Sequence, residues 1–191
     1  MHTVHHTEAF VLKVEPAGEA NRRVWLYTKE FGLVVAAVQG VRKQGAKLQM
    51  NLREYTKVQA DLVKGKDIWR LISVQIMLDP LQGRLKSKLA RPFVRSLSVI
   101  ERFCHGEDMN IGLFEHIKEC MGCLDDDSLD PKSFDTVSVW KIFAHLGYVA
   151  IEESEKKLYE LPLKDAVKDI EPNMRGEWIK KINEIISSTH L

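Results

Sequence analysis

The 191-residue chain contains three cysteines, and its apolar residues form no long run. Cys104, Cys120 and Cys123 are too few and too clustered for a secreted disulfide framework, and one of them must remain unpaired. No apolar stretch approaches the length of a membrane span, and the first residues show no cleavable signal pattern. These absences predict a cytoplasmic protein.

The sequence motifs of common enzymes are missing as well. The chain has no Walker-type phosphate loop, no Gly-x-Gly-x-x-Gly, no Gly-x-Ser-x-Gly and no His-Glu-x-x-His. The acidic run at residues 125–127 lacks the spaced ligands and the glycine of a calcium loop, so it is more typical of a solvated turn. We therefore predict a binding protein without a cofactor rather than an enzyme.

Charge is unevenly distributed along the chain, although the formal net charge is only +1. Residues 1–106 contain 18 Lys and Arg against 9 Asp and Glu, a balance of +9. Residues 107–191 contain 10 against 18, a balance of −8. This split predicts that the basic part binds a polyanion and that the acidic part has a different role.

The first 80 residues have the pattern of a small β-barrel. Short apolar runs bounded by turn residues predict strands near 7–14, 22–28, 33–39, 55–63 and 67–76. Val58, Ala60 and Leu62 alternate with polar residues, as expected where one face of a sheet is buried. Five strands with a long third connection are typical of an OB-fold barrel, so we predict an OB-fold nucleic-acid-binding domain over residues 1–80.

Beyond Pro80 the apolar residues follow a helical period, which predicts an all-α domain over residues 81–191 and an α+β fold class overall. The residues between 149 and 172 are charged and are predicted to be irregular. Asp130 is expected to cap the third helix, in which apolar residues nearly encircle the axis and predict a central position. The four predicted helices cover residues 85–105, about 113–124, 131–146 and 174–188.

The leading candidate site is the basic loop after the third predicted strand. The run Leu33–Val38 is followed by Gly40, Arg42, Lys43 and Lys47. Glycines allow backbone N–H groups to approach a phosphate, and cations replace its counterions. The loop is therefore a plausible place to hold a phosphate backbone.

Other cations and rings of the barrel extend this loop into a possible groove for a sugar-phosphate backbone. Trp25, Tyr27 or Trp69 would offer rings for base stacking. The simpler alternative is a solvated surface in which Tyr27 belongs to the core and Trp25 is merely packed. The candidate nucleic-acid-binding residues are Arg22, Arg23, Arg42, Lys43, Lys47, Arg53, Lys57, Lys64, Lys66 and Trp25.

Cys120 and Cys123 have the spacing of half a zinc site or of a redox pair. No second such pair exists, and neither His105 nor His116 completes a zinc-finger spacing. We therefore predict no metal site, with Cys120 on the apolar face of a helix.

Several short segments, taken in order, resemble the RecO family of bacterial DNA repair proteins. They are Glu8–Lys13, Gly18-Glu19, Arg23–Gly32, Val38–Lys43 and a stretch from Phe134 that ends in Leu146-Gly147-Tyr148. The similarity covers most of residues 7–148 and is densest in the first 80.

The resemblance implies an N-terminal OB domain, a helical C-terminal domain and a role in recombinational repair. It implies binding of single- and double-stranded DNA, annealing of complementary strands, and help in loading RecA onto DNA covered by single-strand-binding protein, with RecR as a partner. Carried over by position, Arg42 and Lys43 would contact the DNA backbone, with Arg22, Arg23 and Lys47 as neighbours.

One departure concerns the four-cysteine zinc module that commonly follows the Leu-Gly-Tyr helix in this family. Residues 149–172 contain no cysteine, so the chain resembles a short form without that module. The departure leaves binding of RecR and of single-strand-binding protein open.

Three functions therefore remain in competition. The leading hypothesis is a non-catalytic DNA-binding recombination mediator. The alternatives are a protein-interaction adaptor that uses its acidic helical half, and an OB-type RNA-binding protein without annealing activity.

Overall fold

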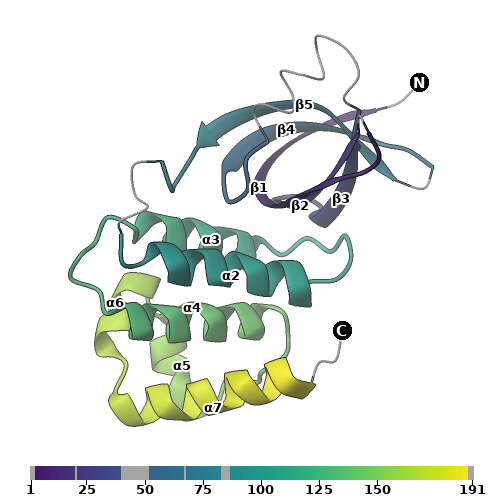
Figure 1. Cartoon of the computed structure of the whole chain (residues 1–191). Coiled ribbons are helices and arrows are strands. Elements are labelled where there is room, and N and C mark those ends of the chain that lie inside the picture. The colour runs from purple at the N-terminus through teal and green to yellow at the C-terminus, as the bar shows by residue number, and fades with distance from the viewer. Residues whose placement is uncertain (1–2, 20, 40–51, 67, 83–86, 189–191) are drawn as a thin grey trace. The chain divides into compact units, whose positions relative to one another are not determined.

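The computed structural model describes residues 3–19, 21–39, 52–66, 68–82 and 87–188. Within these ranges, five strands form a closed barrel in the order β1-β2-β3-β5-β4 (Figure 1). The strands are β1 (Val4–Pro16), β2 (Arg22–Thr28), β3 (Gly32–Val38), β4 (Lys57–Lys64) and β5 (Trp69–Leu78). The predicted fold class, an N-terminal five-stranded OB-type barrel followed by helices, is confirmed.

Alternating side chains account for the buried interior of the barrel. Along β3, Val34, Ala36 and Val38 are buried, whereas the residues between them are partly exposed. Along β4, Val58, Ala60 and Leu62 are buried in the same way, as predicted. Both sets join one apolar cluster with residues from the other three strands, which gives the barrel its own core.

The long strand β1 closes the barrel because it pairs with two neighbours. Its first half pairs with β4, from Val4↔Val63 to Phe10↔Lys57, and its second half pairs with β2. A bulge between Val11 and Lys13 accompanies the change of partner. On the other side, β3 and β5 pair in parallel at Ala36↔Trp69 and Ala37↔Arg70.

Helices make up the second part of the chain, and α4 is central among them. It contacts α2, α6 and α7, and it lies between α2 and α7 (Figure 1). Its N-cap Asp130 accepts a hydrogen bond from the backbone N–H of Ser133, with Pro131 at the first position, as predicted. The helices are α2 (Ala90–Phe103), α3 (Ile111–Gly122), α4 (Pro131–His145), α5 (Glu153–Glu160), α6 (Leu163–Asp169) and α7 (Pro172–Ser188).

The prediction that residues 149–172 are irregular is wrong, because α5 and α6 lie within them. Both helices are short, at 8 and 7 residues, and contacts with distant parts of the chain hold them. Glu155 of α5 accepts a hydrogen bond from Trp178 Nε1 at 2.7 Å. At the start of α6, the backbone N–H of Leu163 donates to Glu119 at 3.1 Å.

The chain divides into two compact units. The barrel unit contains residues 1–82 and 104–114, and the helical unit contains residues 83–103 and 115–191. Within the barrel unit, Phe114 packs against Phe10, with ring centres 5.1 Å apart, and Tyr27 Oη donates to the carbonyl of Asn110 at 3.3 Å. The 104–114 segment is therefore part of the barrel unit although it follows α2 in sequence. None of the described helices combines the length and apolar character needed to cross a membrane.

Candidate nucleic-acid interface

Two arginines flank a small residue on the outer surface of the barrel. Arg23 of β2 is paired in register with Ala37 of β3, and Ala37 is paired with Arg70 of β5. Residues in register share a face of the sheet, and both arginines are exposed. Ala37 has only a methyl group, so its own side chain leaves the space between the two arginines open. Such a row can contact successive phosphates of a strand that crosses β3.

Two further cations lie near this row. Arg22 precedes Arg23 and is paired in register with Val38, and Lys66 lies in the loop between β4 and β5. Both are exposed, and no partner is described for either among residues 3–19, 21–39, 52–66, 68–82 and 87–188. The turn after β1 and the loop after β4 are the places where OB-folds contact oligonucleotides, together with the β2–β3 face.

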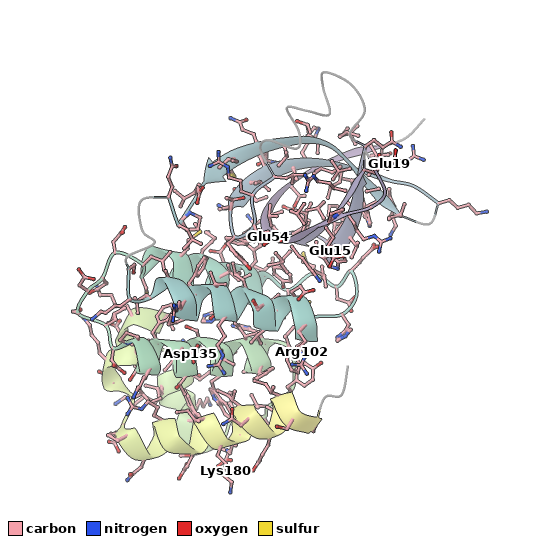
Figure 2. All side chains as sticks on the ribbon, in the orientation of Figure 1. Glu15, Glu19, Glu54, Arg102, Asp135 and Lys180 are labelled. Atoms are coloured by element: carbon pink, nitrogen blue, oxygen red, sulfur yellow. The ribbon has the colours of Figure 1, made fainter. Side chains whose placement is uncertain are left out.

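Acidic residues are also present beside these arginines. Glu15 of β1 is paired in register with Arg23, and Glu19 is exposed in the following turn (Figure 2). Glu15 also forms an ion pair of 2.7 Å with Lys13. The positive charge of this surface is therefore local to the Arg22, Arg23 and Arg70 side chains.

Three of the predicted basic residues hold partners within the barrel unit. Lys57 is mostly buried and forms an ion pair of 2.7 Å with Glu8. Arg53 lies 3.4 Å from Asp79, and Lys64 lies 2.8 Å from Glu107. Lys57 is the least accessible of the three, with 13% of its side chain exposed, so we exclude it from the proposed interface.

The three candidate aromatic rings occupy different environments. Tyr27 is completely buried, and burial raises the pKa of its hydroxyl well above the usual value. Trp69 is also buried, so neither ring is available as a stacking surface, and those two expectations are wrong. Trp25 is half-buried, and the Lys13 ammonium lies 5.2 Å from its ring centre. Trp25 is thus the one of these three rings that remains a candidate for base stacking.

The loop that was the leading candidate from sequence lies outside the described residues. Arg42, Lys43 and Lys47 all belong to it. Their assignment as phosphate contacts stays a prediction, and the geometric argument rests on Arg22, Arg23, Arg70 and Trp25.

The charge split seen along the sequence largely disappears when residues are assigned to their units. The barrel unit has 12 basic and 10 acidic residues, a balance of +2, and the helical unit has 16 and 17, a balance of −1. The reason is that the basic stretch 83–103 belongs to the helical unit. Within it, Arg91 is exposed, whereas Arg95 is paired with Asp135 of α4.

Cys120 and Cys123 are both buried free thiols near the end of α3. Burial raises the pKa of Cys120 to about 12 and that of Cys123 to about 11. Metal ligands and nucleophiles are thiolates, so this environment suits packing better than chemistry. Among the residues that the structure describes, no three His, Cys, Asp or Glu side chains are grouped so as to hold a metal ion.

Sequence reasoning missed Arg70 and Glu107. Arg70 stands between two buried residues of β5, Trp69 and Leu71, so the alternation of that strand already indicated an outward-facing cation. No local signal identified Glu107, because its partners Lys64 and Trp69 lie about 40 positions earlier in the chain.

Comparison with known proteins identifies relatives. Residues 1–78 match the family described as "Recombination protein O N terminal". The DNA repair protein RecO of Gloeothece citriformis is 31% identical over 121 residues, which cover 62% of this chain and 42% of that protein. The DNA repair protein RecO of Thermoanaerobacter sp. is 24% identical over 150 residues, which cover 75% of this chain and 58% of that protein. The chain thus spans about half the length of these relatives.

Proposed function

We propose that this chain, whose residues 1–78 match the RecO N-terminal family, is a RecO-type DNA-binding recombination mediator that catalyses no reaction of its own. In this proposal it binds single- and double-stranded DNA in the cytoplasm, promotes annealing of complementary strands and supports RecA loading in recombinational DNA repair. Its protein partners would be RecR, single-strand-binding protein and RecA. Residues 1–80 would bind nucleic acid, and residues 81–191 would contribute the protein contacts.

The observation that carries the proposal is the outer row of the barrel with Arg23 and Arg70 on either side of Ala37. Arginine side chains bind phosphate oxygens in a forked geometry and release the counterions of the backbone. Neither contact reads a base, so we expect binding that tolerates any sequence. Trp25 would add a stacking surface, which is equally tolerant because every base has an aromatic face.

Annealing follows from the same electrostatics. Two complementary strands repel each other through their phosphates, and a surface that neutralises part of this charge lowers the repulsion. Base pairing then provides both the driving force and the specificity. The Arg22, Arg23 and Arg70 surface needs no acid, base or nucleophile for this role.

The first prediction concerns the salt dependence of single-stranded DNA binding. Arg23→Gln and Arg70→Gln should each weaken binding and reduce the slope of log K against log salt by about 0.7, the value for one lost phosphate contact on a single strand. Lys180→Gln is the matched control, because Lys180 is exposed on α7 and points away from the other helices of its unit (Figure 2). Fluorescence anisotropy with a dT oligonucleotide at several salt concentrations provides the measurement. Equal slopes for all four proteins would refute the assigned surface.

Annealing and nucleic-acid preference are measured with the same proteins. The chain should accelerate pairing of labelled complementary DNA strands at low salt, and Arg23→Gln should be slower than Lys180→Gln. Competition between matched DNA and RNA strands tests the RNA-binding alternative, which predicts preference for RNA. A protein-interaction adaptor would not accelerate pairing of the DNA strands at any salt concentration. That result would contradict the mediator proposal.

A further inference from the structure

Glu107 of the 104–114 segment binds the end of the β4–β5 hairpin through both of its carboxylate oxygens. Lys64 Nζ donates to Oε2 at 2.8 Å, and Trp69 Nε1 donates to Oε1 at 2.8 Å. All three residues belong to the barrel unit. Lys64 and Trp69 are also paired in register, and the ammonium lies 5.2 Å from the centre of the indole ring.

The indole donor of this pair is fixed in place. Only 4% of Trp69 is exposed, and its ring packs against His5 and Phe31, with ring centres 5.4 and 5.3 Å away. The Nε1–H group therefore keeps its direction whichever anion accepts from it. Together with the Lys64 ammonium, it forms a preorganised pair of donors for an anion with two oxygens.

The carboxylate that now fills this position can be reached by solvent. The exposed fractions of the Glu107 and Lys64 side chains are 43% and 59%. Exposed ion pairs contribute little net stability, so another anion can compete for the same donors. The hydrogen bond from Lys64 is the main cause that lowers the pKa of Glu107, which keeps its carboxylate charged at neutral pH.

The surroundings favour a nucleic-acid phosphate as the competing anion. Lys66 lies in the loop directly after Lys64, and Arg70 follows Trp69 on the strand. This β4–β5 loop is one of the regions with which OB-folds contact oligonucleotides. Lys64 and Trp69 share the face of the hairpin opposite Arg70, so a strand that contacts this loop would place a phosphate near Lys64 at the end of the hairpin.

We propose that Lys64 and Trp69 form a phosphate-binding subsite for single-stranded DNA, which Glu107 fills in the free protein and leaves when a backbone phosphate binds. The inference rests on the proposed nucleic-acid binding by the barrel. Glu107 acts as an internal competitor, so the affinity of the free protein is lower than its cations alone would give.

The test uses Glu107→Gln in the full chain, with a fluorescent dT oligonucleotide of about 20 nucleotides as the probe. The amide can still accept from Trp69 but carries no charge to hold Lys64. We expect single-stranded DNA to bind about two- to fivefold more tightly, because the competing exposed ion pair is gone. We also expect the salt slope to change by less than about 0.7, since the same phosphate is bound in both proteins.

Asp108→Asn is the matched control, since it removes the same charge one position away, at an exposed residue that forms no ion pair within the described part of the chain. It should change the affinity less than Glu107→Gln does. In a Lys64→Gln background, Glu107→Gln should give no gain in affinity. Equal gains from Asp108→Asn and Glu107→Gln, or a full gain without Lys64, would show a general charge effect and overturn the subsite.

A direct readout is the indole N–H resonance of Trp69 in ¹⁵N-labelled protein, assigned by the shift that Glu107→Gln causes. It should shift on titration with the oligonucleotide, because its acceptor changes from carboxylate to phosphate. A resonance that stays fixed at saturation would refute the subsite while the mediator proposal stands. If the unaltered chain bound no single-stranded DNA at low salt, the proposed function itself would fail.

Discussion

At the scale of single residues, Gly32 at the start of β3 is tightly constrained by its surroundings. Its φ is +62°, a conformation that side chains with a Cβ rarely adopt. A methyl group at this position would lie 2.2 Å from the carbonyl oxygen of Asp108. The glycine therefore permits close approach between β3 and the 104–114 segment within the barrel unit.

Gly32→Ala should consequently destabilise the protein by more than conformational strain alone. The left-handed backbone costs about 1–2 kcal/mol for alanine, and the clash with Asp108 adds to it. Gly18→Ala is the matched control, because Gly18 has a φ of +86° and nothing within 4 Å of the added methyl group. In urea denaturation, the free energy of unfolding of Gly32→Ala should be lower than that of Gly18→Ala by at least about 1 kcal/mol. Equal losses of unfolding free energy in the two variants would mean that the 104–114 segment moves away from the added methyl group at no energetic cost.

Individual aromatic residues also show where sequence reasoning ends. The alternation of β2 places Tyr27 on the face opposite the inward residues Val24 and Leu26. It could not show that this outer position is covered, because the covering Phe114 lies 87 positions later, with ring centres 6.5 Å apart. Trp69 instead lies on the inward face of β5 with Leu71, and His5 and Phe31 pack against its ring. Burial by distant residues therefore decides which rings can stack on bases.

At the scale of elements, α4 illustrates a helix whose position follows from local signals. Asp130 accepts from the backbone N–H of Ser133 at 2.8 Å and from its hydroxyl at 2.9 Å. Gly147, with a φ of +79°, follows the end of the helix. Asp130 was identified from the sequence because a cap acts within a few positions. By contrast, α5 and α6 depend on Trp178 and Glu119, which no local pattern connects with them.

Asp130→Ala should lower the free energy of unfolding by about 1 kcal/mol, the usual loss for an N-cap. The hydrogen bonds from Ser133 are the main causes that lower the pKa of Asp130, so the carboxylate stays charged at neutral pH. Asp127→Ala removes the same charge from an exposed position of the preceding turn and should change stability by less than about 0.5 kcal/mol. Chemical denaturation of both variants at neutral pH gives the comparison. A larger loss from Asp127→Ala would contradict the capping role.

At the scale of the whole molecule, the five-stranded barrel was predictable because alternation and turn residues are local properties. The division of the chain into two units was predicted only approximately. The predicted boundary between residues 80 and 81 lies near the end of the first barrel segment, but residues 104–114 return to the barrel unit. Charge counted along the sequence was misleading for the same reason, since residues 83–103 belong with the helices.

The helical unit also contains a buried histidine, His116, and a half-buried one, His145, that make its stability depend on pH. His116 lies within hydrogen-bond distance of the Ser138 carbonyl, at 3.1 Å, so its Nε2 is the protonated ring nitrogen that donates. Burial, together with the nearby His145 and Lys141, lowers the pKa of His116 to about 3. Burial likewise lowers the pKa of His145. Both rings are therefore neutral in the folded protein at neutral pH.

Stability should consequently fall on acidification, because the unfolded chain takes up protons that the folded chain excludes. The contribution of His116 is complete above its unfolded pKa of about 6.5 and is lost progressively as the pH falls from there toward 3. Each such histidine adds a slope of at most about 1.4 kcal/mol per pH unit. Urea denaturation between about pH 7 and pH 5 avoids most carboxylate titration. His116→Asn should reduce this slope even if it lowers stability at every pH, whereas His105→Asn, at an exposed position, should retain it. An unchanged slope in His116→Asn would mean that the cluster opens to water before its histidines are protonated.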